Sequence, residues 1–106
     1  VSAAGDVNGD GYGDLLIGST GGDGAGNSKS NAGESYLIFG GVSLPATIDL
    51  ANLGGLGVTI YGADVGDRIG ISVTAAGDVN GDGFDDFLIQ SRYGDAEGNL
   101  KTDAGE

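Results

Sequence analysis

The sequence lacks cysteine, histidine, methionine and tryptophan, and it has a single proline in 106 residues. Without cysteine the chain can form no disulfide, thiolate nucleophile or zinc site with sulfur ligands. Without histidine it has neither the commonest general base nor the commonest transition-metal ligand. Apolar runs are short, and none approaches the roughly 18 residues of a membrane-spanning helix. We therefore expect neither thiol or imidazole chemistry nor membrane insertion.

Basic residues are also scarce. Four Lys and Arg stand against sixteen Asp and Glu, which gives a formal net charge of −12. Nucleic acids and anionic membranes select clusters of Lys and Arg, so neither is expected as a partner. We expect the few basic side chains to be scattered, solvated charges: Lys29, Arg68, Arg92 and Lys101. What remains is an acidic chain rich in oxygen donors, the ligand type that Ca²⁺ prefers.

The chain is built on an internal repeat. Residues 1–34 align without gaps with residues 73–106, at an offset of 72, and 22 of these 34 positions are identical. The sequence is thus one full repeat, residues 1–72, followed by the first half of a second, residues 73–106. A unit of this length exceeds most solenoid repeats and suits a propeller blade with long loops.

Short apolar segments predict the strands. Residues 69–75 alternate between apolar and small or polar side chains, and apolar runs occupy residues 15–17, 36–39, 58–61 and 87–89. Glycines separate the runs, and continuous apolar runs fit strands covered on both faces. We predict an all-β fold of four-stranded antiparallel β-propeller blades, with about one and a half blades present. Residues 48–53, which follow Pro45, are expected to form a short helical turn or an extended connection.

Both ends of the chain fall within a predicted blade. A half blade leaves open sheet edges and an uncovered apolar face. We therefore expect the sequence to be part of a longer chain with more blades. The alternative is that separate copies pair edge to edge and complete each other's blades by strand addition.

An acidic nonapeptide with the pattern D-x-N-x-D-G-x-x-D occurs once in each repeat, at residues 6–14 and 78–86. Oxygen side chains fall at positions 1, 3, 5 and 9, and glycine at position 6 permits the sharp turn that wraps a loop round an ion. The carbonyl of position 7 can add a ligand, which frees its side chain to point into the apolar interior. The predicted metal ligands are Asp6, Asn8, Asp10, the Tyr12 carbonyl and Asp14, then Asp78, Asn80, Asp82, the Phe84 carbonyl and Asp86.

Three carboxylates within nine residues repel one another unless a cation is present. An EF-hand needs a bidentate Glu at position 12, where this chain has Ile17 and Ile89. Asp14 and Asp86, at position 9, are the natural bidentate ligands instead. A flexible loop with five protein groups favours Ca²⁺ over Mg²⁺. We predict about two Ca²⁺ ions per chain; the alternative is a pair of Asx-rich turns that hold no ion.

A second feature is the long glycine-rich loop of residues 18–34, which returns at residues 90–106. Asp23 and Asn27 are expected to form turns, with a second ion or ligand as the alternative. Catalysis is not expected. An active site is normally unique, whereas these acidic clusters recur with the repeat, and their spacing suits wrapping a cation rather than glycoside hydrolysis.

Residues 66–73 and 76–89, which hold the second acidic loop in its strand–loop–strand frame, resemble the FG-GAP repeat of integrin α-subunit β-propellers and their bacterial relatives. Both eponymous motifs differ: Ile69-Gly70 replaces Phe-Gly, and residues 18–20 and 90–92 replace Gly-Ala-Pro. The resemblance implies radially arranged blades with Ca²⁺ between the first two strands of each blade, held by the ten ligands above. It also implies a role outside the cell.

Together these features lead us to expect a non-catalytic, calcium-binding propeller segment with a structural or adhesive role, at the cell surface or outside a bacterial cell. Its expected partners are neighbouring blades or other copies of the chain, and a protein or glycan ligand. Two alternatives remain open. One is a propeller module of a secreted enzyme, and the other is a self-assembling subunit of an extracellular filament or layer.

Overall fold

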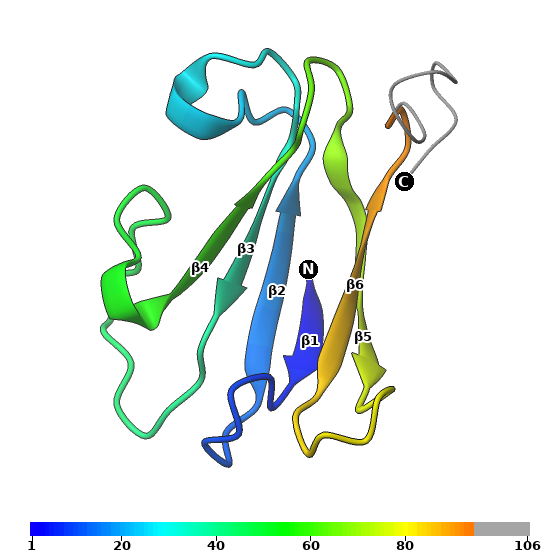
Figure 1. Ribbon diagram of the computed structural model, residues 1–106. Coiled ribbons are helices and arrows are strands. Elements are labelled where there is room, and N and C mark those ends of the chain that lie inside the picture. The colour runs from blue at the N-terminus through cyan, green and yellow to red at the C-terminus, as the bar shows by residue number, and fades with distance from the viewer. Residues whose placement is uncertain (95–106) are drawn as a thin grey trace.

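A computed structural model describes residues 1–94 and shows two antiparallel sheets packed against each other (Figure 1). The first sheet contains β1 (Ser2–Gly5), β2 (Asp14–Ser19), β3 (Glu34–Ile38) and β4 (Gly57–Tyr61). The second contains β5 (Ile69–Gly77) and β6 (Asp86–Ser91). Two 3-10 turns, η1 (Ala25–Asn27) and η2 (Gly54–Leu56), lie in the connections. No helix within residues 1–94 has the length and apolar character needed to cross a membrane.

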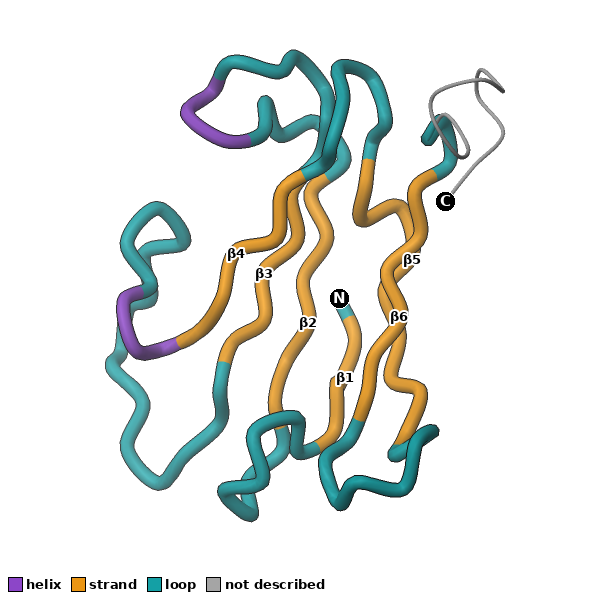
Figure 2. The backbone as a smooth tube through the Cα atoms, viewed as in Figure 1, coloured by secondary structure: helices purple, strands orange, loops and turns teal. Residues whose placement is uncertain are grey.

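The first sheet is a four-stranded meander in which the strands follow one another in chain order (Figure 2). The pairs Ser2–Leu16, Leu16–Leu37 and Leu37–Val58 form one continuous row across it. The second sheet repeats only the first antiparallel pair. The prediction of an all-β fold with one four-stranded blade and half of a second is confirmed, because every predicted apolar run lies in or next to a strand of the expected sheet.

The core lies between the two sheets. Ala4, Leu16 and Leu37 are fully or almost fully buried, and Val73 and Phe87 of the second sheet pack against them. Continuous apolar runs were predicted for strands with both faces covered, but within the described residues β2 has one covered face. Leu16 lies buried against β5 and β6, whereas its neighbour Leu15 points to the opposite face and is 40% exposed.

The backbones of the two sheets approach each other closely where β5 passes β2 and β3. A Cβ atom on Gly70 would lie 2.8 Å from Ser35 Oγ and 3.0 Å from Gly18 Cα, and Gly70 has a left-handed φ of 89°. Gly33 and Ile69 form an isolated parallel bridge beside this point. Glycine is therefore required in the second position of the Ile69-Gly70 pair, because the backbones of neighbouring blades meet there.

The connections follow the sequence predictions in part. Residues 49–52 form a single hydrogen-bonded turn in which the Asn52 amide donates to the Asp49 carbonyl over 3.0 Å, and the 3-10 turn η2 begins only after the predicted segment, at Gly54. The turn interpretation is confirmed for Asn27, whose amide donates to the Gly24 carbonyl over 3.0 Å in η1, whereas Asp23 Oδ1 accepts the more distant Asn31 amide over 3.1 Å and so closes the loop. The corresponding part of the second copy, including Lys101, lies in residues 95–106, outside the described residues.

Candidate metal centre

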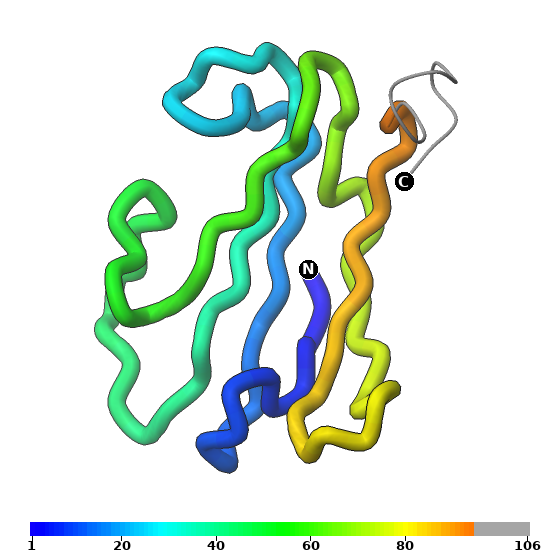
Figure 3. Tube along the Cα trace, viewed as in Figure 1, coloured from blue at the N-terminus to red at the C-terminus, as the bar shows by residue number. Residues whose placement is uncertain are grey.

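The two acidic loops lie side by side at one end of the molecule (Figure 3). Residues 6–14 join β1 to β2, and residues 78–86 join β5 to β6. Each loop therefore connects the first two strands of its own sheet, and the packing of one sheet on the other brings the pair together. The repeat places two equivalent clusters of carboxylates next to each other.

In the first loop, the side chains at positions 1, 3 and 5 fold inward over the backbone. The Asp10 amide donates to Asp6 Oδ1 over 3.0 Å and to Asn8 Oδ1 over 3.3 Å. The Gly11 amide donates to Asp6 Oδ2 over 2.8 Å, and Asn8 Nδ2 donates to Asp10 Oδ2 over 3.2 Å. Three oxygen-bearing side chains thus converge within one turn.

The second loop repeats this arrangement closely. The Asp82 amide donates to Asp78 Oδ1 over 3.1 Å and to Asn80 Oδ1 over 3.3 Å, and the Gly83 amide donates to Asp78 Oδ2 over 2.8 Å. Two copies separated by 72 residues and differing in their surroundings adopt one geometry. The local sequence therefore determines the shape of the loop, as is typical of Asx turns closed by glycine.

The aspartate at position 9 closes the base of each loop. Asp14 is only 4% exposed; its Oδ2 accepts the Val7 amide over 2.7 Å and its Oδ1 accepts the Gly40 amide over 2.9 Å. Asp86 Oδ2 accepts the Val79 amide over 2.9 Å in the same way. Each carboxylate oxygen has a further lone pair, so the predicted role of Asp14 and Asp86 as metal ligands stays a prediction.

The expectation for the side chain at position 7 is wrong. Tyr12 and Phe84 were expected to point into the apolar interior, yet they are 42% and 45% exposed. Both loops project beyond the ends of the strands, where there is no core to enter. Phe84 instead lies over the other loop, since a Cβ atom on Gly9 would fall 2.4 Å from its ring.

Backbone amide groups, rather than basic side chains, solvate the carboxylates of the loops, so their negative charge stays uncompensated. Backbone N–H donors, led by that of Gly83, hold the pKa of the Asp78 carboxyl below its ordinary value. This carboxylate therefore favours the folded loop at neutral pH, and that contribution is lost as the pH falls through its lowered pKa. The Lys29 ammonium group donates its hydrogen bond to the Ala63 carbonyl over 2.5 Å, outside both acidic loops.

The donor set fits a hard divalent cation in chemistry, because carboxylate and amide oxygens are the ligands that Ca²⁺ takes. It also fits in position, since the oxygens at positions 1, 3 and 5 already share one turn. Within residues 1–94, however, no three acidic side chains stand together in the arrangement of a finished metal site. Asp14 and Asp86, at position 9, turn toward amides at the base of the loop.

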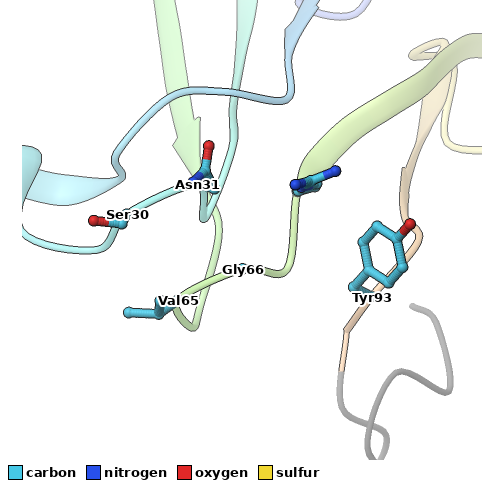
Figure 4. Close-up of a pocket in the computed structure, with 6 residues that line it drawn as sticks. Ser30, Asn31, Val65, Gly66 and Tyr93 are labelled. Carbon is cyan, nitrogen blue, oxygen red and sulfur yellow. The ribbon is translucent and has the colours of Figure 1, made fainter.

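The opposite end of the molecule holds an open pocket, and the basic residues there meet the earlier expectation in part. Arg68 and Arg92 are exposed, as expected of solvated charges, but they are not scattered, because their guanidinium carbons lie 5.4 and 5.2 Å from the centre of the Tyr93 ring. Such distances are typical of cation–π contacts. Figure 4 shows this pocket, which is lined by Ser30, Asn31, Val65, Gly66, Arg68 and Tyr93.

A further polar pair lies on β3. The Tyr36 hydroxyl donates a short hydrogen bond to Glu34 Oε2, two residues away on the same face of the strand. The bond to Glu34 is the main cause that raises the pKa of Tyr36 to about 12, with burial as the next cause. The protonated hydroxyl stabilises the fold fully below the ordinary value of 10.0, and this contribution is lost as the pH rises through about 12.

We expect one tyrosine of this protein to titrate at about 12 in an absorbance titration of the folded chain at 295 nm. Tyr36→Phe should remove that step. Glu34→Gln should shift it toward 10, because an uncharged acceptor destabilises the tyrosinate less. A titration in which Glu34→Gln leaves the late step in place would contradict the assignment to this pair.

One residue that sequence reasoning missed connects the two loops. Asp85 Oδ2 accepts the Asp6 amide over 2.9 Å, and the Asp85 amide donates to the Asp6 carbonyl over 3.0 Å. Asp85 occupies position 8 of the second loop, where the first loop has Gly13. This difference between otherwise similar copies was the only signal in the sequence, and its partner lies 79 residues away.

Comparison with known families agrees with this geometry. A family model described as FG-GAP repeat matches residues 1–38 and 70–106. The two matched segments contain β1 to β3 and β5 to β6, and each includes one acidic loop. A search of curated proteins finds no match.

Proposed function

Because this chain belongs to the FG-GAP repeat family, we propose that it is a calcium-binding propeller segment in which each acidic loop holds one Ca²⁺. The observation that carries the proposal is the duplicated geometry. In both loops the oxygens at positions 1 and 3 converge on the amide of position 5, at matching distances. A bound divalent cation would offset two of the carboxylate charges in each loop, of which the first loop has three and the second four.

The loops' own residues prepare the site. Hydrogen bonds from the backbone amides of Asp10 and Gly11 fix both carboxylate oxygens of Asp6. The buried Asp14 carboxylate accepts the Val7 amide and so connects the end of the loop to its start. Part of the conformational entropy of aligning the donors is therefore lost on folding, and only the remainder on ion binding, which favours affinity. Calcium in turn would rigidify the connection between the first two strands of each blade.

We propose that the other face of the second sheet is covered by a neighbouring blade or by another copy of the chain. Leu16 is 0% exposed beneath β5 and β6, whereas its repeat equivalent Leu88 is 61% exposed. Within the described residues, this leucine is therefore buried by a neighbouring sheet in the first blade and left exposed in the second. Burial of such a residue contributes about 1.5–3 kcal/mol.

The role we propose is structural and adhesive, at the surface of a bacterial cell or outside it. The millimolar Ca²⁺ found there would keep such loops filled. A protein or glycan is the proposed ligand of the whole propeller, and neither nucleic acid nor membrane is a proposed partner, given the net charge of −12. FG-GAP repeats are generally non-catalytic, and we propose no enzymatic activity for this segment.

Single substitutions should remove the ions one at a time. Calorimetric titration of the chain with CaCl₂ is expected to show about two bound ions, with about one in Asp10→Ala and about one in Asp82→Ala. Each change deletes the carboxylate at position 5, which accepts the amide of position 7 within its loop. The loss of a direct ionic ligand should weaken that site by more than the roughly 10–100-fold that the loss of an outer-shell partner costs.

The matched control is Asp49→Ala. Asp49 also accepts a nearby amide, that of Ala51 over 3.0 Å, but it lies outside both loops. This variant loses the same charge and should still bind two ions. If Asp10→Ala and Asp82→Ala bind as many ions as the unmodified chain, the sites lie elsewhere.

A further inference from the structure

We propose that Asp85 couples the two loops, so that Ca²⁺ bound in one raises the affinity of the other. This inference rests on the proposed calcium binding and deepens it. Asp85 is outside the predicted ligand set, yet it holds both backbone groups of Asp6, the residue at position 1 of the first loop. It therefore acts as a positioning residue rather than as a ligand.

The contact between the loops consists of two hydrogen bonds that run in opposite directions between Asp6 and Asp85. The Asp85 carboxylate accepts the Asp6 amide over 2.9 Å, and the Asp85 amide returns a bond of 3.0 Å to the Asp6 carbonyl. Two opposed hydrogen bonds fix both the distance and the rotation of one loop against the other. A displacement of either residue breaks at least one bond, so the loops move as a pair.

Glycines in the first loop make room for the second. A Cβ atom on Gly5 would lie 2.4 Å from Asp85 Oδ2, and one on Gly9 would lie 2.4 Å from the Phe84 ring. Their repeat equivalents Gly77 and Gly81 have nearly the same φ, 71° and 73° against 76° and 75°, yet no described atom lies within 4 Å of a Cβ placed there. The close fit therefore belongs to the junction between blades.

The chain connects this junction directly to both sets of donors. Asp85 stands between Phe84 and Asp86, the predicted ligands at positions 7 and 9 of the second loop, and it is bonded to Asp6 of the first. Ordering the second loop fixes Asp85, which in turn fixes the Asp6 backbone. An ion that arrives at the first loop then orders fewer free groups, and the effect is equal in the reverse direction.

Binding measurements on the 106-residue chain test the coupling. Asp82→Ala and Asp10→Ala report the Ca²⁺ affinity of the first and second loop alone. In the unmodified chain, the product of the two association constants should exceed the product of these single-site constants at least fivefold, the lower range of typical couplings. Asp85→Ala, placed in all three backgrounds, should reduce this factor to about one.

Asp85→Asn separates the hydrogen bonds from the charge. The side-chain amide keeps an oxygen that can accept the Asp6 amide, but it removes the negative charge. The coupling factor should therefore be largely retained in Asp85→Asn. If Asp85→Asn abolishes the coupling as completely as Asp85→Ala, then charge rather than the two-bond contact carries it, and the proposal is overturned.

Hydrogen exchange of the Asp6 amide provides a readout that needs no ion. In EDTA, Asp85→Ala should speed this exchange about tenfold relative to the unmodified chain, the effect of losing one hydrogen bond. Gly9→Ala should also speed it, since it displaces Phe84. Gly81→Ala, which imposes the same left-handed strain without a described neighbour, should leave it unchanged.

The outcomes distinguish the two proposals. Two bound ions with a coupling factor near one overturn the coupling alone, and an unchanged Asp6 exchange rate in Asp85→Ala overturns its structural basis. Absence of any bound Ca²⁺ in the unmodified chain overturns the proposed function and the coupling with it.

Discussion

In excess EDTA, the melting temperature of this protein is expected to fall by at least about 20 °C relative to the same chain in millimolar Ca²⁺. A site at a free ligand concentration of 100 times its Kd stabilises the native state by about 2.7 kcal/mol. Two such sites contribute about 5 kcal/mol, which is comparable with the whole stability of a small domain. One kcal/mol corresponds to roughly 4–8 °C in a domain of this size.

The physical reason lies in the unbalanced charge of the loops. The first contains three carboxylates and the second four, and they accept backbone amides rather than pairing with basic side chains. Thermal unfolding followed by circular dichroism in CaCl₂, MgCl₂ and EDTA would measure the effect, with MgCl₂ restoring less stability than CaCl₂. Identical melting curves in CaCl₂ and EDTA would mean that the loops are ordinary Asx turns.

A second large effect is expected from Gly70→Ala, which should lower the free energy of unfolding by about 2–4 kcal/mol. Gly70 has a φ of 89°, which costs an alanine about 1–2 kcal/mol. The new methyl group would also meet Ser35 Oγ at 2.8 Å, the Glu34 carbonyl oxygen at 2.9 Å and Gly18 Cα at 3.0 Å. Two of these three neighbours are backbone atoms of the adjacent blade, which cannot move aside without disturbing β2 or β3.

Gly66→Ala provides the matched control for this substitution. Gly66 has a similar φ of 83°, but no described atom lies within 4 Å of a Cβ placed there. It should therefore show the backbone cost alone, about 1–2 kcal/mol. The difference between the two variants in urea denaturation measures the contact between blades. Equal destabilisation would mean that the close approach of β5 to β2 contributes nothing.

Local features of the sequence predicted most of the fold. Period-2 alternation in residues 69–75 and apolar runs bounded by glycine give strands wherever they occur, because a pleated backbone presents alternate side chains to opposite faces. The acidic nonapeptides were equally predictable. Their internal bonds join residues two to seven positions apart, so each loop takes its shape from its own sequence.

Contacts between segments far apart in the sequence could not be predicted from these local features. Phe84 was expected in the interior, but its ring lies over Gly9 of the other loop. Arg68 and Arg92 lie 24 positions apart in the sequence, and only the arrival of β6 beside the segment preceding β5 places both against Tyr93. Neither composition nor periodicity describes which loops become neighbours.

The sequence by itself determined the repeat, the strands and the shape of the two acidic loops, because each depends on residues close together along the chain. Tertiary structure alone decided that Leu16 is buried whereas Leu88 is exposed, and that Asp85 holds Asp6 across a separation of 79 residues. The physical reason is that equivalent residues in a repeat carry the same local information. Their surroundings differ only when one blade packs on the next, which covers one copy and leaves the other without a neighbour among the described residues.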